Sequence, residues 1–119
     1  MYQIDFKKPQ AVHFIGIGGI SMSGLAEILM DEGFTVSGSD AHRSELTARL
    51  EEKGAKIFYG QRAQNIGDGL DLVVYTAAIH EENPELQEAK RRNLPLLSRA
   101  ELLGQMMKNY GRAVAVAGT

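Results

Sequence analysis

The amino-acid sequence predicts an α/β fold in which strands and helices alternate along the chain. Two observations lead to this prediction. Short apolar or β-branched runs recur at intervals, and most are followed by a segment whose apolar residues fall at helical spacing. Such alternation builds parallel β-α-β units with right-handed crossovers. We therefore expect a Rossmann-like, doubly wound, mainly parallel five-stranded sheet with helices on both faces.

The expected strands are short runs of apolar and β-branched residues, as in buried parallel sheets. The first run ends in glycine, and the last of them is short enough to form an edge strand. One more run, at 113–116, looks like a strand whose partner elements are missing from the chain. The five strands are expected at 11–17, 35–39, 56–58, 72–75 and 95–97.

Start and stop signals predict the helices. The first carries apolar residues from Met22 to Leu29 and ends at Gly33, where a C′ glycine belongs. Ser44 caps the second, which ends at Gly54. The last two begin with Asn83-Pro84-Glu85, which supplies a cap, a first-turn proline and an acid, and with Ser98-Arg99-Ala100-Glu101, which has capping-box spacing.

Length and composition exclude several classes of protein. A chain of 119 residues is the size of one domain, and a net charge of −2 argues against nonspecific nucleic-acid binding. The absence of cysteine excludes a disulfide scaffold and thiolate chemistry. Residues 1–10 contain no apolar signal-peptide core, and no window approaches 18 apolar residues. We expect a cytoplasmic protein that binds neither nucleic acid nor membranes.

A glycine-rich loop lies between the first expected strand and the first expected helix, where phosphate loops occur. Gly16 allows the tight turn, and Gly18 and Gly19 leave room for a phosphate against the backbone. Ser21 stands where the dinucleotide fingerprint has its third glycine, and its hydroxyl can itself reach a phosphate. Gly24, one turn on, is expected to allow close packing of helix on sheet.

Asp40 follows Gly18 by 22 residues, at the end of the second strand, where NAD enzymes place a carboxylate on a ribose hydroxyl. The alternative is that Asp40 caps the turn that follows it. The segment 76–79 follows the fourth strand across the expected crevice, and its small residues let a sugar or base approach. These motifs indicate a nucleotide diphosphate and do not separate NAD, FAD or a nucleotide sugar.

Other candidates for chemistry are weak. The histidines His13, His42 and His80 lack metal-ligand spacing, and His13 is expected to be a strand residue. Glu81 and Glu82 precede a helix and suit its dipole rather than a catalytic pair. We expect no catalytic residue and no metal site in this chain.

Several motifs in order resemble the N-terminal domain of the Mur ligase family, in the branch that joins L-alanine to UDP-N-acetylmuramate. The resemblance covers nearly the whole chain and is more specific than the glycine loop alone. The segments that carry it are 13–26, Ser37-Gly38-Ser39-Asp40, Thr76-Ala77-Ala78-Ile79, Asn83-Pro84-Glu85, Ser98-Arg99-Ala100-Glu101 and Val116-Ala117-Gly118-Thr119.

The resemblance implies a cytoplasmic ligase of peptidoglycan synthesis with three domains, the first of which binds the UDP moiety. ATP and Mg²⁺ would bind the central domain, where the muramate carboxylate is phosphorylated and then attacked by L-alanine. The loop residues Gly16, Gly18, Gly19, Ile20 and Ser21 would cradle the diphosphate. Asp40 would meet the uridine, and Thr76, Ala77 and Ala78 would line the crevice.

The resemblance also implies a domain boundary, with residues 1–110 binding the UDP-sugar and 111–119 beginning the ATP-binding domain. Gly118 and Thr119 would start its phosphate loop, whose lysine does not follow in this chain, so the chain alone is expected to be inactive. Two positions depart from the family pattern: Ser21 stands for a glycine, and Gln61 stands for a histidine that would approach the uridine. The main alternative is the NAD(P)- or FAD-binding domain of an oxidoreductase.

Overall fold

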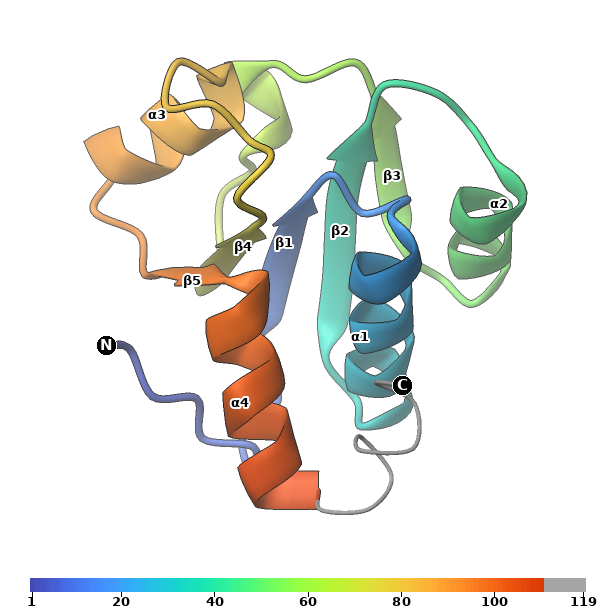
Figure 1. The fold of residues 1–119 in the computed structure, drawn as a ribbon, viewed down its shortest axis with the longest axis vertical. Coiled ribbons are helices and arrows are strands. Elements are labelled where there is room, and N and C mark those ends of the chain that lie inside the picture. Colours follow the sequence, from blue (N-terminus) through green and yellow to red (C-terminus); the bar gives the residue numbers. More distant parts are fainter. Residues whose placement is uncertain (111–119) are drawn as a thin grey trace.

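A computed structural model describes residues 1–110 and shows a five-stranded sheet with the order β3-β2-β1-β4-β5 (Figure 1). Each neighbouring pair of these strands is parallel, which confirms the doubly wound prediction. The strand expected at 113–116 lies outside the described residues. The strands are β1 (Ala11–Ile15), β2 (Thr35–Asp40), β3 (Lys56–Tyr59), β4 (Leu72–Tyr75) and β5 (Leu96–Ser98).

The helices begin where the cap residues predict. Ser44 and Thr47 form a reciprocal capping box, and the Asn83 side chain accepts from the first-turn N–H groups of Glu85 and Leu86. A short 3₁₀ helix, η1, was not expected from the sequence. The helices are α1 (Ile20–Asp31), α2 (Glu45–Glu52), η1 (Ala63–Asn65), α3 (Pro84–Arg91) and α4 (Arg99–Tyr110). Among these helices, none is long and apolar enough to cross a bilayer.

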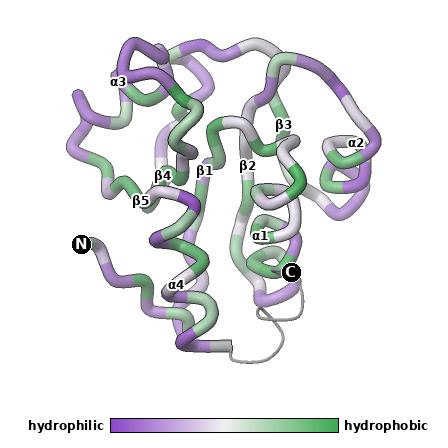
Figure 2. Tube along the Cα trace, in the orientation of Figure 1, coloured by the Kyte–Doolittle hydropathy of each residue, from purple (hydrophilic) through white to green (hydrophobic). Residues whose placement is uncertain are grey.

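The sheet separates two apolar layers. Side chains alternate along β1, so Val12 and Phe14 join the cluster under α1, α2 and α4, whereas Ile15 joins the cluster under α3 and η1. Leu102 and Met106 of α4 are fully buried in the first cluster, as the apolar stripe of this helix predicts. Figure 2 shows hydrophobic colour along the strands and hydrophilic colour on the outer turns.

The chain after β1 crosses close over β2. A Cβ atom on Gly38 of β2 would lie 2.6 Å from Ile17 Cδ1 and 2.8 Å from the Phe14 carbonyl oxygen. Glycine is therefore required at position 38 so that the loop can turn from β1 into α1. Since β1 lies between β2 and β4, this loop opens at the point where the strand order reverses, the usual ligand position in such sheets.

Two local expectations were wrong. The first strand ends at Ile15 rather than at Ile17, because Gly16 adopts a positive φ of 84° and leaves the extended conformation. Gly24 does not pack against the sheet: it lies on the exposed side of α1, and a Cβ atom there would meet nothing within 4 Å. The buried side of α1 is formed by Met22, Ser23, Leu25, Ala26 and Leu29.

Candidate functional site

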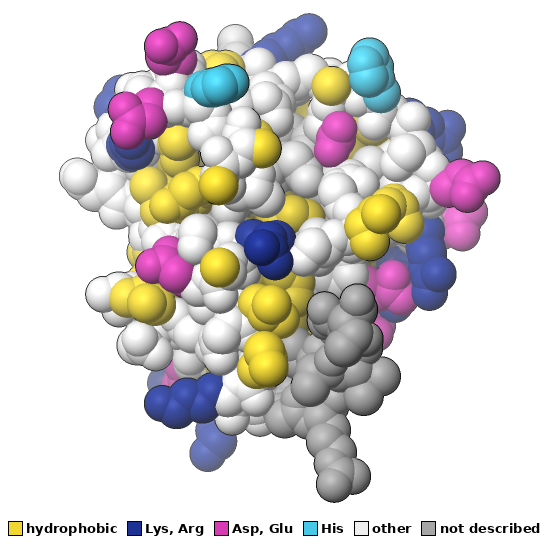
Figure 3. All heavy atoms as spheres, viewed as in Figure 1, with side chains coloured by type: hydrophobic (Ala, Val, Ile, Leu, Met, Phe, Trp, Pro, Cys, Tyr) yellow, Lys and Arg dark blue, Asp and Glu magenta, His cyan; other side chains and the backbone are white. Residues whose placement is uncertain are grey.

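A hollow of about 530 Å³ opens at the carboxyl end of the sheet. This volume is within the range of small-molecule sites. Figure 3 shows the face that carries α1 and α4, with hydrophobic side chains gathered around its centre. The hollow is lined by Gly16, Gly18, Gly19, Ile20, Ser21, Met22, Asp40, Thr76, Ala78, Ile79 and Arg99.

The first half of the glycine loop is held by β2. The Ser39 carbonyl oxygen accepts from the N–H groups of both Gly16 and Ile17, each at 2.9 Å. The Asp40 carboxylate accepts from the N–H of Gly18 at 2.8 Å. These three loop N–H groups are therefore already bonded within the protein.

The second half of the loop leaves donors free. Gly19 is the N-cap of α1 and offers no side-chain cap, and the first turn contains no acidic residue. Within residues 1–110, no acceptor is recorded for the N–H groups of Ile20, Ser21 and Met22. The first turn of a helix carries a partial positive charge and binds anions. The hollow can thus accept a phosphate over the first turn of α1.

Asp40 is only partly exposed, and both of its carboxylate oxygens accept backbone hydrogen bonds, Oδ1 from Ala41 N–H and Oδ2 from Gly18 N–H. The hydrogen bond from Ala41 N–H agrees with the alternative that Asp40 caps the following turn. The hydrogen bond from Gly18 N–H joins the carboxylate to the glycine loop. A Cβ atom on Gly18 would lie 2.7 Å from Asp40 Oδ2, so this close approach itself requires glycine. The expected contact of Asp40 with a ribose stays a prediction.

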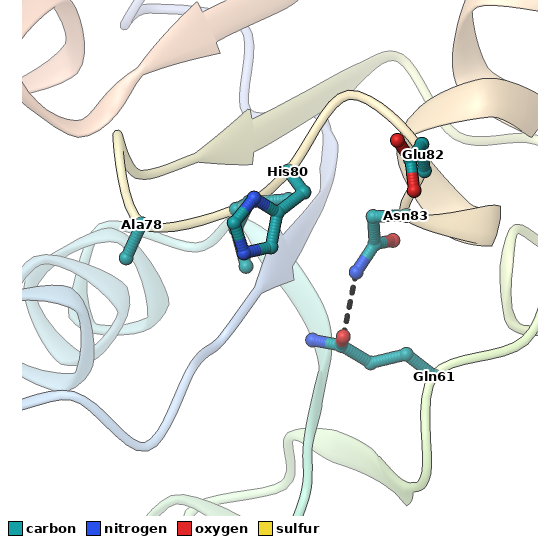
Figure 4. Close-up of a pocket in the computed structure, with 6 residues that line it drawn as sticks. Gln61, Ala78, His80, Glu82 and Asn83 are labelled. Atoms are coloured by element: carbon teal, nitrogen blue, oxygen red, sulfur yellow. Dashed lines mark hydrogen bonds between the residues drawn. The ribbon is translucent and has the colours of Figure 1, made fainter.

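The segment after β4 forms the opposite wall. Thr76 and Ala78 line the hollow as expected, whereas Ala77 is exposed and is not among the lining residues. A second hollow of about 300 Å³ shares Ala78 with the first. Figure 4 shows its floor, where the Asn83 amide donates to the Gln61 side-chain oxygen at 2.6 Å. Gln61, which replaces the expected histidine, and Asn83 thus both line this second hollow.

Comparison with known proteins decides the family. Residues 11–111 match the family model described as "Mur ligase family, catalytic domain". The chain belongs to the Mur ligase family. A UDP-N-acetylmuramate–L-alanine ligase of Agathobacter rectalis is 66% identical over 119 residues, which is the whole chain and 26% of that protein. The corresponding ligase of Lachnoclostridium phytofermentans is 58% identical over 119 residues, again the whole chain and 25% of that protein. The chain thus spans about a quarter of the length of these relatives.

Solved structures of Mur ligases share this fold. The crystal structure of the UDP-N-acetylmuramate–alanine ligase of Thermotoga maritima matches with a TM-score of 0.82 and 35% identity, over 86% of this chain and 24% of that chain. A shikimate dehydrogenase of Aquifex aeolicus matches with a TM-score of 0.53 and 19% identity, over 93% of this chain and 53% of that chain. The second likeness shows the fold alone and gives the oxidoreductase alternative no support.

The structure of this Mur ligase domain also shows a buried polar cluster that sequence reasoning missed. Glu85 was interpreted as a first-turn acid, but its side chain is fully buried. Its Oε1 accepts from His13 Nε2 at 2.6 Å and from Ser39 Oγ at 2.8 Å, and its Oε2 accepts from Asn65 Nδ2 at 2.8 Å and from Arg62 N–H at 3.2 Å. Glu85 therefore joins β1, β2, the loop before η1, and α3.

Burial on its own would raise the pKa of the Glu85 carboxyl, but hydrogen bonds from His13, Asn65 and Ser39 outweigh it and lower that pKa. The carboxylate is thus kept ionised beneath the glycine loop. One signal in the sequence could have revealed it. His13 lies in a buried strand, on the face toward α3, and a buried polar side chain requires a partner.

Arg99 was missed as a lining residue. It is the first residue of α4, and its Nη1 donates to Ser21 Oγ at 3.2 Å. The sequence did contain a signal: Arg99 directly follows the predicted N-cap Ser98. A cation at that position opposes the helix dipole, so its presence indicates a role other than stabilising the helix. The remaining histidines, His42 and His80, are exposed, and residues 1–110 contain no group of acidic, histidine or cysteine residues that could hold a metal ion. Gly118 and Thr119 lie outside the described residues.

Proposed function

We propose that this chain binds the UDP moiety of UDP-N-acetylmuramate, as the N-terminal domain of the ligase that joins L-alanine to that nucleotide sugar. One observation carries the proposal: the free N–H groups of α1 open into the hollow at the switch point of the sheet. The names of relatives that match the whole chain at 66% and 58% identity support the substrate.

In this proposal the diphosphate lies over the first turn of α1, against Gly19, Ile20 and Ser21. Gly16 and Gly18 shape the turn, since their own N–H groups are bonded to β2. The sugar nucleotide extends between Asp40 on one side and Thr76 with Ala78 on the other, and Ala77 lies at the outer rim. The second hollow continues this crevice past Ala78.

The complete ligase would use ATP, Mg²⁺ and L-alanine in its other domains. Gly118 and Thr119 would begin the ATP-binding loop, and the boundary between domains would fall near residue 110. We propose that the complete enzyme acts in the cytoplasm and binds neither nucleic acid nor membranes.

Isothermal titration calorimetry of the purified chain tests the proposal. The ligands are UDP-N-acetylmuramate, UDP, NADH and NADPH, with ADP as a control that has the same diphosphate and a different base. We expect the two uridine nucleotides to bind more tightly than the others. A ligand at 100 times its dissociation constant should also raise the free energy of unfolding by about 2.7 kcal/mol. Tighter binding of NADH or NADPH would reject the ligase assignment.

A further inference from the structure

Arg99 supplies a positive charge to the glycine-loop hollow. Among the described residues that line this hollow, it alone is basic. Its side chain is partly buried, and no carboxylate of residues 1–110 lies within ion-pair distance of it. Arg91 and Arg92 differ, since both pair with Glu88 on the surface. The charge of Arg99 is therefore available to a ligand.

The place of Arg99 in its helix is electrostatically unfavourable. A cation in the first turn opposes the helix dipole and is destabilising there. Capping does not require it, because Ser98 Oγ accepts from Glu101 N–H at 3.1 Å and the Glu101 carboxylate accepts from Ser98 N–H at 2.8 Å. A bound anion between α1 and α4 would offset this repulsion. The hydrogen bond from Arg99 to Ser21 Oγ joins α4 to α1, but this contact alone does not require a positive charge.

The charges of the hollow are separated across the sheet. Asp40 ends β2, and Arg99 follows β5. The strand order places β1 and β4 between them, so the two strand ends are three spacings, roughly 14 Å, apart. The acidic end of the hollow repels phosphate and accepts hydroxyl groups, whereas the basic end attracts phosphate. A nucleotide would therefore bind in one direction only.

We propose that Arg99, together with Ser21 Oγ, binds the β-phosphate of the nucleotide sugar and selects a nucleoside diphosphate over a monophosphate. The inference rests on the proposed function and adds a residue and a direction to it. The ribose lies toward Asp40 and the α-phosphate over the first turn of α1. The β-phosphate, which is farther from Asp40, then receives the guanidinium, whose planar fork matches phosphate oxygens.

Calorimetric titration of the wild-type chain, Arg99→Ala and Arg99→Lys with UDP and UMP tests the inference. We expect Arg99→Ala to weaken UDP binding at least tenfold and UMP binding less than threefold. Arg99→Lys should recover part of the UDP affinity, because lysine keeps the charge without the fork. UDP affinity should fall less steeply with salt in Arg99→Ala than in wild type. Arg91→Ala is the control, since it removes the same charge from an exposed site on α3.

Thermal unfolding separates binding from structure. The melting temperature of Arg99→Ala should equal or exceed that of wild type, because the substitution removes a cation from a helix N-terminus. Wild-type affinity for UDP in Arg99→Ala would overturn the inference and leave the proposed function standing. Equal losses for UDP and UMP together with a lower melting temperature would also overturn it, as a structural effect. Absence of UDP binding in the wild-type chain would reject the proposed function and the inference together.

Discussion

Replacement of Gly18 by alanine tests the contact between the glycine loop and β2. The new Cβ atom would lie 2.7 Å from Asp40 Oδ2 and 3.1 Å from Thr47 Cγ2. Thr47 is fully buried and belongs to the capping box of α2, so the Asp40 carboxylate has to move. That movement breaks the hydrogen bond from Gly18 N–H to Asp40.

The magnitude follows from this one hydrogen bond. A hydrogen bond to a charged group contributes about 1.5–3 kcal/mol, and the partial exposure of Asp40 places it at the lower end of that range. Gly18 does not have a positive φ, so alanine is not strained there and gains about 0.4–1 kcal/mol from the unfolded chain. We expect a net loss of about 1 kcal/mol, which lowers the melting temperature by about 4 °C.

The assay combines thermal unfolding, followed by circular dichroism, with calorimetric titration of UDP. We expect the UDP affinity of Gly18→Ala to fall at least tenfold, because the displaced Asp40 carboxylate lines the hollow and the loop that it holds is released. Gly24→Ala, in the helix that follows the loop, is the matched control, because a Cβ atom there meets open space. It should bind UDP as wild type does and gain up to about 1 kcal/mol from helix propensity.

Two results would refute this reasoning about Gly18. If Gly18→Ala had the melting temperature and the UDP affinity of the wild-type chain, Asp40 would not hold the loop. A large loss of UDP affinity in Gly24→Ala would show that any methyl group on α1 disturbs the site, and the effect at Gly18 would then have no specific meaning.

The remaining predictions concern the supports of the site. Glu85→Ala should lower the free energy of unfolding in urea by about 3 kcal/mol or more, because His13 loses its buried partner; a loss below about 1 kcal/mol would contradict this. Since the folded pKa of Glu85 is lowered, its stabilisation is complete above the ordinary glutamate pKa of about 4.3 and is lost as the pH falls through the folded pKa. The difference in free energy of unfolding between wild type and Glu85→Gln should therefore become smaller as the pH falls. A difference that does not change with pH would contradict this prediction. Gly38→Ala should lower the free energy of unfolding, measured by calorimetry, by about 1–3 kcal/mol, since its Cβ atom would lie 2.8 Å from the Phe14 carbonyl oxygen. A variant as stable as wild type would show that β2 can move away from this contact.

Local signals were enough to predict most of the fold. The caps at Ser44, Asn83 and Ser98 place the starts of α2, α3 and α4 correctly, because each cap acts on N–H groups within three residues. The end of the first strand could not be predicted from such local signals. Ile17 is apolar because its side chain is buried in the core beyond the turn, and apolarity reports burial rather than strand geometry.

Contacts between distant segments could not be predicted in the same way. His13 meets Glu85 across 72 residues, and Arg99 meets Ser21 across 78 residues. Each pairing depends on the order of strands in the sheet and on which face a side chain occupies. Motif spacing found the glycine loop and Asp40 because they are joined by one β-α-β unit. The position of Thr76 and Ala78 after β4 was predicted as well, but Arg99, which follows β5, was not.

The glycine loop is fixed from beneath by groups that do not line the hollow. Ser39 holds the Gly16 and Ile17 N–H groups through its carbonyl oxygen, and its hydroxyl donates to Glu85. Because the Glu85 carboxylate also binds His13 of β1, the two strands that carry the loop are tied to the start of α3. The N–H groups at the start of the loop are thus bonded within the protein, whereas those in the first turn of α1 remain free for the proposed ligand. If the proposed function holds, buried residues of β1, β2 and α3 set the position of the bound phosphate as much as the glycines do.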